Sequence, residues 1–210
     1  MEQEFWHSKW EKKEIGFHQP SVNPLLEKHF ASLKLEKGAR VFVPLCGKTL
    51  DIHWLYGKGY HVTGAELSEI AVRELFDEME LTPTIRERGG LKQFSAERID
   101  IFVGDFFALS KALLGATDAV YDRAALVALP SEMREKYARQ LVEVTKAAPQ
   151  LQITFTYDQS IMKGPPFSLA EDDIAGLYAA DYNICLLESH AVDVKGNPAV
   201  ESARLLLARA

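Results

Sequence analysis

Short apolar runs alternate along the chain with stretches whose apolar residues recur at helical spacing, and this pattern predicts strands alternating with helices. Residues 41–43 form an apolar run typical of a strand buried on both faces. Apolar residues then recur at helical spacing over residues 50–57, with Thr49 or Asp51 available as the cap. Residues 61–66 predict a second strand, so this stretch is expected to form one βαβ unit.

The alternation continues downstream, so the expected fold class is α/β with a doubly wound, mostly parallel sheet. The last two predicted strands are joined by the turn residues 195–198, which predicts an antiparallel hairpin at the sheet edge. Residues 80–98 contain Pro83, Gly89, Gly90 and many charges, and are expected to form a surface excursion. With 210 residues, the chain is expected to be a single domain, 1–210. The other predicted helices cover residues 24–33, 68–79, 131–146 and 168–180, and the other predicted strands cover residues 99–103, 118–121, 151–157, 184–194 and 200–209.

Residues 1–20 combine aromatic side chains with many charges. Trp6 and Trp10 are four residues apart, so they share one face of a helix. One interpretation is that this face packs on the domain as ordinary core. The other is that residues 1–20 form a lid over a cofactor site, because an aromatic helix that covers a pocket would have the same composition. The sequence alone leaves both interpretations open.

Gly47 and Glu66 have the spacing of a nucleoside-binding site. Leu45 and Gly47 lie in the loop after the first strand, and Glu66 ends the second strand 19 residues after Gly47. In doubly wound sheets, ligands bind at the carboxyl ends of the strands, and an acid about 20 residues after the loop glycine accepts hydrogen bonds from ribose hydroxyls. The dinucleotide motif G-x-G-x-x-G is missing, and Phe42 replaces the first glycine of a Walker loop. A ligand with a ribose but no phosphate fits this pattern, and S-adenosylmethionine is such a ligand. The alternative is that Glu66 is a solvated acid on the surface.

Two further residue pairs lie at the ends of predicted strands. Asp105 and Phe106 follow the strand at 99–103, where an acid can meet adenine or its amine, although Gly-Asp is also an ordinary turn signal. Asp122 and Arg123 follow the strand at 118–121. They are either site residues or a surface ion pair.

The charge balance disfavours large anionic partners. The chain has 24 Lys and Arg against 30 Asp and Glu, with a net charge of −6 and a pI near 5.6. Neither phosphate backbones nor anionic lipids are attracted to an acidic surface, so we expect no nucleic-acid partner, no membrane partner and a small-molecule substrate. No apolar stretch reaches the roughly 18 residues of a membrane span, and the N-terminus lacks the apolar core of a signal peptide. A soluble, unexported protein is expected.

The cysteines and histidines predict neither a disulfide framework nor a metal site. Cys46 and Cys185 have no disulfide or metal spacing, which suggests a reducing, cytoplasmic location. The six histidines show no ligand spacing with these cysteines, and G-x-S-x-G is absent. Metalloenzyme and hydrolase functions are therefore disfavoured, and no metal is expected.

Long collinear motifs resemble one known family. The runs VFVPLCGKTLD with GAELSEIAV, YDRAALVALPSEMREKYA and TYDQSIMKGPPFSLAEDDI closely resemble the thiopurine S-methyltransferase family in its bacterial form, and so does the N-terminal run WHSKWEKKEIGFHQP. The resemblance covers nearly the whole chain.

The resemblance implies a class I methyltransferase fold with a Rossmann-like, seven-stranded, mostly parallel sheet and an antiparallel edge hairpin. It implies S-adenosyl-L-methionine as methyl donor, S-adenosyl-L-homocysteine as product, and an aromatic or heterocyclic thiol such as a thiopurine as acceptor. A monomer is expected. The positions that match family contacts are Trp10, Leu45, Glu66 and Arg123 for the cofactor, Asp105 and Phe106 for its adenine side, and Phe17 for the acceptor.

Methyl transfer to an acidic ring thiol needs positioning and exclusion of water more than it needs acid–base help. Arg123 and Asp122 are the candidate catalytic residues, and Arg123 is also expected to contact cofactor and acceptor. Two alternatives stay open. One is a methyltransferase of the same fold that acts on an inorganic selenium or tellurium oxyanion, and the other is a binding module that holds the nucleoside without turnover.

Overall fold

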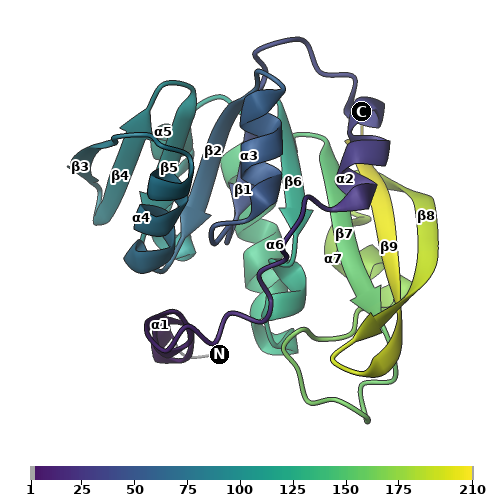
Figure 1. The fold of residues 1–210 in the computed structure, drawn as a ribbon. Coiled ribbons are helices and arrows are strands. Elements are labelled where there is room, and N and C mark those ends of the chain that lie inside the picture. The colour runs from purple at the N-terminus through teal and green to yellow at the C-terminus, as the bar shows by residue number, and fades with distance from the viewer. Residues whose placement is uncertain (1–2, 210) are drawn as a thin grey trace.

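A nine-stranded sheet forms the centre of the molecule in the computed structural model, which describes residues 3–209 (Figure 1). The strands are β1 Arg40–Pro44, β2 His61–Glu66, β3 Thr84–Arg88, β4 Leu91–Ala96, β5 Ile99–Val103, β6 Ala119–Arg123, β7 Gln150–Thr156, β8 Tyr182–Val194 and β9 Asn197–Ala208. Their order across the sheet is β3-β4-β5-β2-β1-β6-β7-β9-β8. The central strands β5, β2, β1, β6 and β7 are parallel, and the strands outside them pair antiparallel. The carboxyl ends of the central strands therefore meet at one edge.

Helices cover both faces of the sheet, which confirms the predicted doubly wound architecture (Figure 1). The helices are α1 Gln3–Glu11, α2 Pro24–His29, α3 Leu50–Gly57, α4 Glu69–Glu78, α5 Lys111–Leu114, α6 Ser131–Thr145 and α7 Glu171–Tyr178, with 3₁₀ turns at Phe30–Leu33, Phe106–Ala108 and Leu126–Ala128. Residues of α2, α3 and α4 build one hydrophobic core, and residues of α5, α6 and α7 build the other. The helix α1 belongs to neither core and lies near α4, at the edge where the parallel strands end (Figure 1).

The strand β1 shows why its residues must all be apolar. Val41 and Val43 belong to the core under α2–α4, and Phe42 belongs to the core under α5–α7. All three are fully or almost fully buried, because side chains alternate between two covered faces. A polar residue at any of these positions would be buried without a partner, which explains the continuous apolar run in the sequence.

The sequence-based expectation for residues 80–98 was wrong. This segment forms the antiparallel hairpin β3–β4, which pairs with β5 and extends the sheet to nine strands instead of the seven implied by the resemblance. Gly89 and Gly90 have φ of 59° and 86°, values that a two-residue hairpin turn requires. Every residue of β3 is exposed, so this edge strand lacks the apolar alternation by which a strand is recognised.

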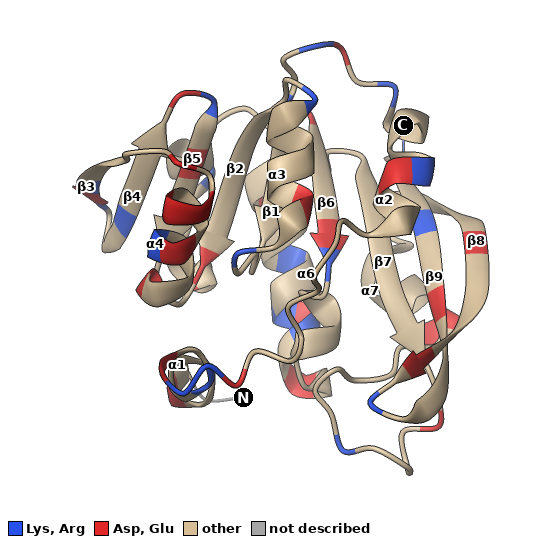
Figure 2. Ribbon diagram, viewed as in Figure 1, with Lys and Arg blue, Asp and Glu red and all other residues tan. Residues whose placement is uncertain are grey.

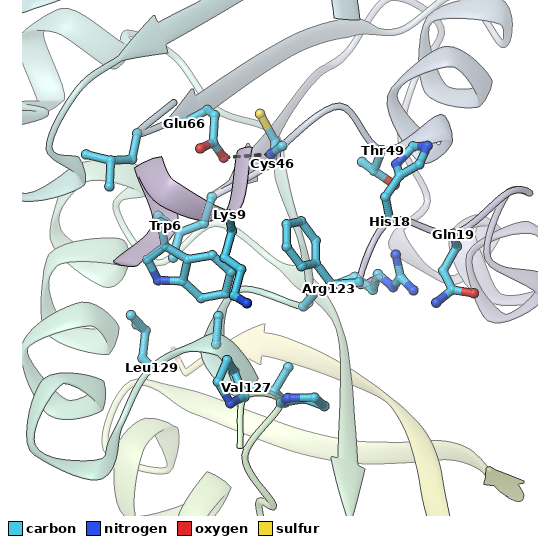
Figure 3. A pocket seen from close by; sticks show the side chains of 18 of the residues that line it. Trp6, Lys9, His18, Gln19, Cys46, Thr49, Glu66, Arg123, Val127 and Leu129 are labelled. Carbon is cyan, nitrogen blue, oxygen red and sulfur yellow. Dashed lines mark hydrogen bonds between the residues drawn. The ribbon is translucent and has the colours of Figure 1, made fainter. Parts of the chain in front are cut away.

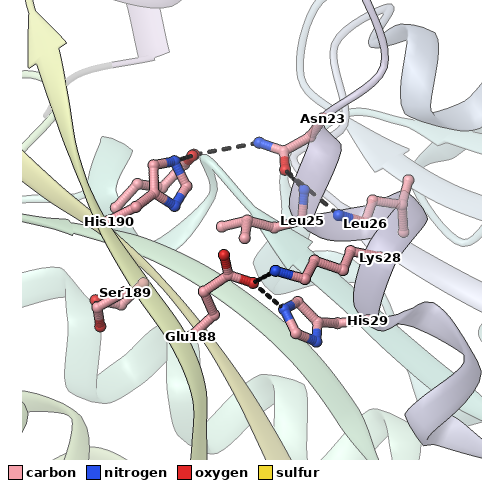
Figure 4. Close-up of polar contacts among 10 residues, drawn as sticks. Asn23, Leu25, Leu26, Lys28, His29, Glu188, Ser189 and His190 are labelled. Atoms are coloured by element: carbon pink, nitrogen blue, oxygen red, sulfur yellow. Dashed lines mark hydrogen bonds and ion pairs between the residues drawn. The ribbon is translucent and has the colours of Figure 1, made fainter.

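The helix predicted over residues 24–33 is divided into α2 and a 3₁₀ turn, and the helix predicted over 168–180 is shortened to α7. Asn23 caps α2: its Oδ1 accepts from the amides of Leu25 and Leu26, at 2.8 and 3.4 Å (Figure 4). At the other end of α2, Lys28 and His29 converge on Glu188 of β8 (Figure 4). These contacts hold α2 against the β8–β9 hairpin.

Side chains of both signs are interspersed over the described residues (Figure 2). Among residues 3–209, no helix is long and apolar enough to cross a membrane.

Neighbouring residues of β6 point to opposite faces of the sheet, and this separates two residues that the sequence had paired. Arg123 lines the cavity described below, whereas Asp122 is buried on the α6 side. The Asp122 carboxylate accepts from the Tyr137 hydroxyl at 2.9 Å and from the Leu126 amide at 3.5 Å. Asp122 therefore forms no surface ion pair with Arg123. Burial raises the pKa of Asp122 to about 6, although both hydrogen bonds oppose the shift.

The raised pKa makes the stability of the fold depend on pH through Asp122. Since the folded pKa lies above the usual value of 3.8, the folded state takes up a proton between about pH 6 and 4 that the unfolded state does not. The free energy of unfolding should therefore rise as the pH falls through this window, by up to about 3 kcal/mol. Asp122→Asn keeps the shape and an acceptor for Tyr137, and should remove this contribution. Urea unfolding of both proteins at several pH values measures it; a difference between them that does not vary with pH would contradict this account.

Candidate active site

A cavity of about 1020 Å³ lies where the parallel strands end, beneath α1 (Figure 3). Its walls come from segments far apart in the sequence: α1 and the following loop, the loop after β1, the ends of β2, β5 and β6, the loop at 164–166 and the tip of the β8–β9 hairpin. The predicted residues that line it are Trp10, Phe17, Leu45, Gly47, Glu66, Asp105, Phe106 and Arg123. The structure thus brings together every predicted site residue except Asp122.

Glu66 fixes the loop after β1. Its Oε2 accepts from the Gly47 amide at 2.7 Å (Figure 3). Its Oε1 accepts from the Ser68 amide at 2.8 Å. The residue is only 7% exposed, and burial raises the pKa of its carboxyl while these amides oppose the shift. Leu45 and Gly47 have φ of 45° and 53°, so the loop turns sharply between β1 and α3. Each carboxylate oxygen keeps one further lone pair, which suits the ribose hydroxyls of a nucleoside.

The side chain of Trp10 explains why residue 47 is a glycine. A Cβ atom on Gly47 would lie 3.2 Å from Cζ2 of Trp10, which is tighter than an ordinary contact. Trp10 is 4% exposed, and its ring meets Phe17 edge to face at a centroid distance of 5.5 Å. Trp6 meets Phe17 in the same way at 5.5 Å. The three rings form an aromatic cover over the cavity.

The end of β5 supplies a second polar group. Asp105 caps the 3₁₀ turn through the Phe107 amide at 2.9 Å, and its other oxygen accepts from Nε2 of Gln3 at 3.1 Å. The contact with Gln3 connects the start of α1 to the floor of the cavity. Phe106 is buried and packs against Tyr137, so an apolar surface lies beside the carboxylate, as an adenine ring requires.

Arg123 lies across the cavity from Glu66 (Figure 3). Its side chain is 10% exposed, and its Nη1 lies 4.0 Å from Oδ2 of Asp51. Its buried Nε finds no hydrogen-bond partner among residues 3–209. A planar guanidinium with donors to spare can bind and orient an acceptor that carries partial negative charge.

Several lining residues were missed from the sequence. Asp51 was considered only as a helix cap, and Tyr121 only as part of a strand; both line the cavity together with Asn23 and Glu201. Alternation along β6 could have indicated Tyr121, since it precedes Arg123 by two positions. No local signal indicates Glu201, because it reaches the site through the long-range pairing of β9.

The lining residues fit a nucleoside. Glu66, the left-handed loop at Gly47 and the apolar floor at Phe106 match a ribose, a closely approaching ligand and an adenine ring. Among residues 3–209, no cluster of three His, Cys, Asp or Glu side chains could hold a metal ion.

Comparison with known proteins identifies the family of this chain. Residues 1–205 match the family described as Thiopurine S-methyltransferase. The chain is 52% identical over 201 residues to the thiopurine S-methyltransferase of Gluconobacter oxydans strain 621H, covering 94% of this chain and 91% of that protein. It is 51% identical over 210 residues to the thiopurine S-methyltransferase of Xanthobacter autotrophicus strain Py2, covering 98% and 99%.

Solved structures with a similar fold include methyltransferases. The 1,6-didemethyltoxoflavin-N1-methyltransferase of Burkholderia thailandensis, solved with 1,6-didemethyltoxoflavin and S-adenosylhomocysteine, superposes with a TM-score of 0.67 at 15% identity, covering 98% of this chain and 87% of that one. A SAM-dependent methyltransferase from Anabaena variabilis superposes with a TM-score of 0.65 at 12% identity, covering 99% and 95%. Sequence and fold agree, and the chain belongs to the thiopurine S-methyltransferase family of S-adenosylmethionine-dependent methyltransferases.

Proposed function

We propose that this chain transfers a methyl group from S-adenosyl-L-methionine to the sulfur of small aromatic or heterocyclic thiols, such as thiopurines. One observation carries the proposal: a single cavity has a buried acid with ribose spacing, Glu66, on one side and a guanidinium with spare donors, Arg123, on the other. The thiopurine methyltransferases that this chain resembles at about 50% identity support the choice of sulfur as acceptor.

S-adenosylmethionine, when bound, supplies an electrophilic methyl group, so the chain itself must bind, align and exclude water. Glu66 is proposed to accept hydrogen bonds from the ribose, and Asp105 with Phe106 to hold the adenine side. Trp10 and Phe17 are proposed to cover the cavity, Phe17 on the acceptor side. Holding acceptor and donor in line beneath such a cover contributes effective molarity and removes competing water.

Arg123 is proposed to orient the acceptor and the cofactor. Asp122 is proposed to act only by supporting the fold, since it lies on the other face of β6. The cavity is built from one chain, which supports action as a monomer. Cys46 and Cys185 are free thiols, as is usual in a reducing cytoplasm, where we propose that the enzyme works.

Glu66→Ala should weaken binding of S-adenosylhomocysteine by roughly 10- to 100-fold, because hydrogen bonds to a charged group contribute about 1.5–3 kcal/mol. Glu66→Gln, which keeps one acceptor oxygen and the shape, should lose less. Isothermal titration calorimetry measures both, with Glu69→Ala, at a partly exposed position of α4 that does not line the cavity, as control. Wild-type affinity in a folded Glu66→Ala protein would remove Glu66 from the site.

The aromatic cover should protect residues 3–19 from trypsin when S-adenosylhomocysteine is bound, because cleavage at Lys9, Lys12 or Lys13 requires α1 to leave the cavity. Gly47→Ala should reduce this protection, since its Cβ would press against Trp10. Gly38→Ala is the matched control: φ is +81° there, but nothing lies within 4 Å of the added Cβ.

Equal cleavage of wild type with and without ligand would argue that α1 is ordinary core. If ligand protected Gly47→Ala and Gly38→Ala equally, contact between residue 47 and Trp10 would not be needed for the cover to form.

Arg123→Lys keeps the charge but loses the planar fork, and should lower kcat/KM for a thiopurine and for a simple aryl thiol by about 10- to 100-fold. Arg73→Lys on the exposed face of α4 serves as control. Mass analysis of products formed from labelled methyl donor establishes the reaction, with selenite and tellurite included in the acceptor panel. If Arg123→Lys had wild-type kinetics, the positive charge of Arg123, and not its planar shape, would be its role. Methylation of selenite or tellurite but of no thiol would overturn the thiol proposal.

A further inference from the structure

Asp51 is a fully buried carboxylate in the wall of the cavity, beside Arg123. It lies in the first turn of α3, directly after the loop that Gly47 and Glu66 shape. Helix capping does not account for it, because its side chain points away from its own helix and accepts hydrogen bonds from two other elements. A buried charge of this kind is costly unless partners surround it.

Three groups meet the Asp51 carboxylate. Oδ1 accepts from the backbone amide of Asn23 at 2.8 Å, and Oδ2 accepts from the Tyr121 hydroxyl at 2.9 Å. Nη1 of Arg123 lies 4.0 Å from the same Oδ2. Burial and the Asp51 charge raise the pKa of Tyr121 well above its usual range, so the phenol stays protonated and donates. The carboxylate is thus held rigidly, and Arg123 is the cation that faces it.

The charge of Arg123 is a problem for methyl transfer unless it is compensated. The acceptor loses its S–H proton to solvent, the thiolate lone pair forms the new S–C bond, and the methyl–sulfonium bond of the donor breaks. The negative charge of the thiolate and the positive charge of the sulfonium both disappear in this step. An uncompensated cation beside the thiolate would therefore stabilise the ground state more than the transition state, and would slow the reaction.

We propose that Asp51 is a positioning residue that neutralises Arg123 across this 4.0 Å ion pair, so that the acceptor sulfur meets guanidinium donors without a net positive charge. The proposal rests on the thiol methyltransferase function proposed above. It predicts that the ionisation of the bound acceptor, and not only the stability of the fold, depends on Asp51.

Other titratable groups surround the pair and must be separated from it. Glu201 of β9 accepts from Nδ2 of Asn23 at 3.2 Å, and His190 lies 3.6 Å beyond it. His18 lies on the other side, where burial and the charges of Lys48 and Arg123 lower its pKa while Glu78 and Glu74 oppose the shift. Glu201→Gln is the matched control, because it removes one negative charge from the same cavity without removing the partner of Arg123.

The decisive measurement follows the acceptor itself. In a ternary complex with S-adenosylhomocysteine, no methyl group can be transferred, and the ultraviolet absorbance of a bound aryl thiol reports its thiolate fraction at each pH. Asp51→Asn should lower the pKa of the bound thiol by about one unit, because an uncompensated Arg123 favours the anion. Steady-state kinetics should show a lower KM and a kcat reduced by roughly five- to tenfold, with the acid limb of kcat shifted to lower pH. Glu201→Gln should shift the thiol pKa much less, and His18→Gln should leave it unchanged.

An unchanged thiol pKa in a folded Asp51→Asn protein would overturn the proposal, as would an equal shift in Glu201→Gln. Where Asp51→Asn alone does not fold, the same change in an Arg123→Gln background keeps the test valid, since removing both charges leaves the wall neutral. The thiol pKa should then return towards its wild-type value, and a value unchanged from Arg123→Gln would overturn the proposal. Failure of the wild-type enzyme to methylate any aryl thiol would instead contradict the proposed function, so the two failures are distinguishable.

Discussion

The carboxylate of Glu66 is the constraint on which one side of the cavity depends. It ties the amide of Gly47, in the loop after β1, to the amide of Ser68, in the turn after β2. The adjacent parallel strands place both turns at the same edge, and the carboxylate sets the distance between them. The left-handed turn at Gly47 then leaves room for the Trp10 ring. A single side chain therefore links the strands, the loop and the aromatic cover.

The buried carboxylates on the two sides of the cavity are stabilised by different kinds of partner. Glu66 is stabilised by backbone amides and is poised to accept from neutral hydroxyls. At the other side, Asp51 is surrounded by an amide, a phenol and a guanidinium, so charge is balanced within a cluster of side chains. Under the proposed function, amides fixed by the fold hold the carboxylate that binds the donor, and the Asp51–Arg123 charge pair faces the acceptor.

Local sequence patterns predicted those features that local interactions determine. The apolar run of β1, the helical spacing over residues 50–57 and the strand at residues 61–66 correctly predicted the central βαβ unit, because these patterns depend on residues close together in the chain. The β3–β4 hairpin was not predicted, because every residue of β3 is exposed and its composition is that of a loop. Asp51 and Glu201 were not predicted as cavity residues, because their partners are distant in sequence: Tyr121 lies 70 residues from Asp51. The pairing of Asp122 with Arg123 ignored the alternation of a strand, which sends the two side chains to opposite faces.

Two turns that do not belong to the parallel core line one side of the cavity and form its roof. Lys195, at the tip of the β8–β9 hairpin, donates from its Nζ to the carbonyl of Pro165 at 2.7 Å, in the loop after β7. Both turns project beyond the sheet, so either can gain or lose residues without altering the register of any strand pair. Relatives with different roofs could therefore accept acceptors of different size while the donor half stays the same. Differences in sequence and length within this family should accordingly concentrate at these two turns. To redesign the choice of acceptor, both turns should be exchanged together.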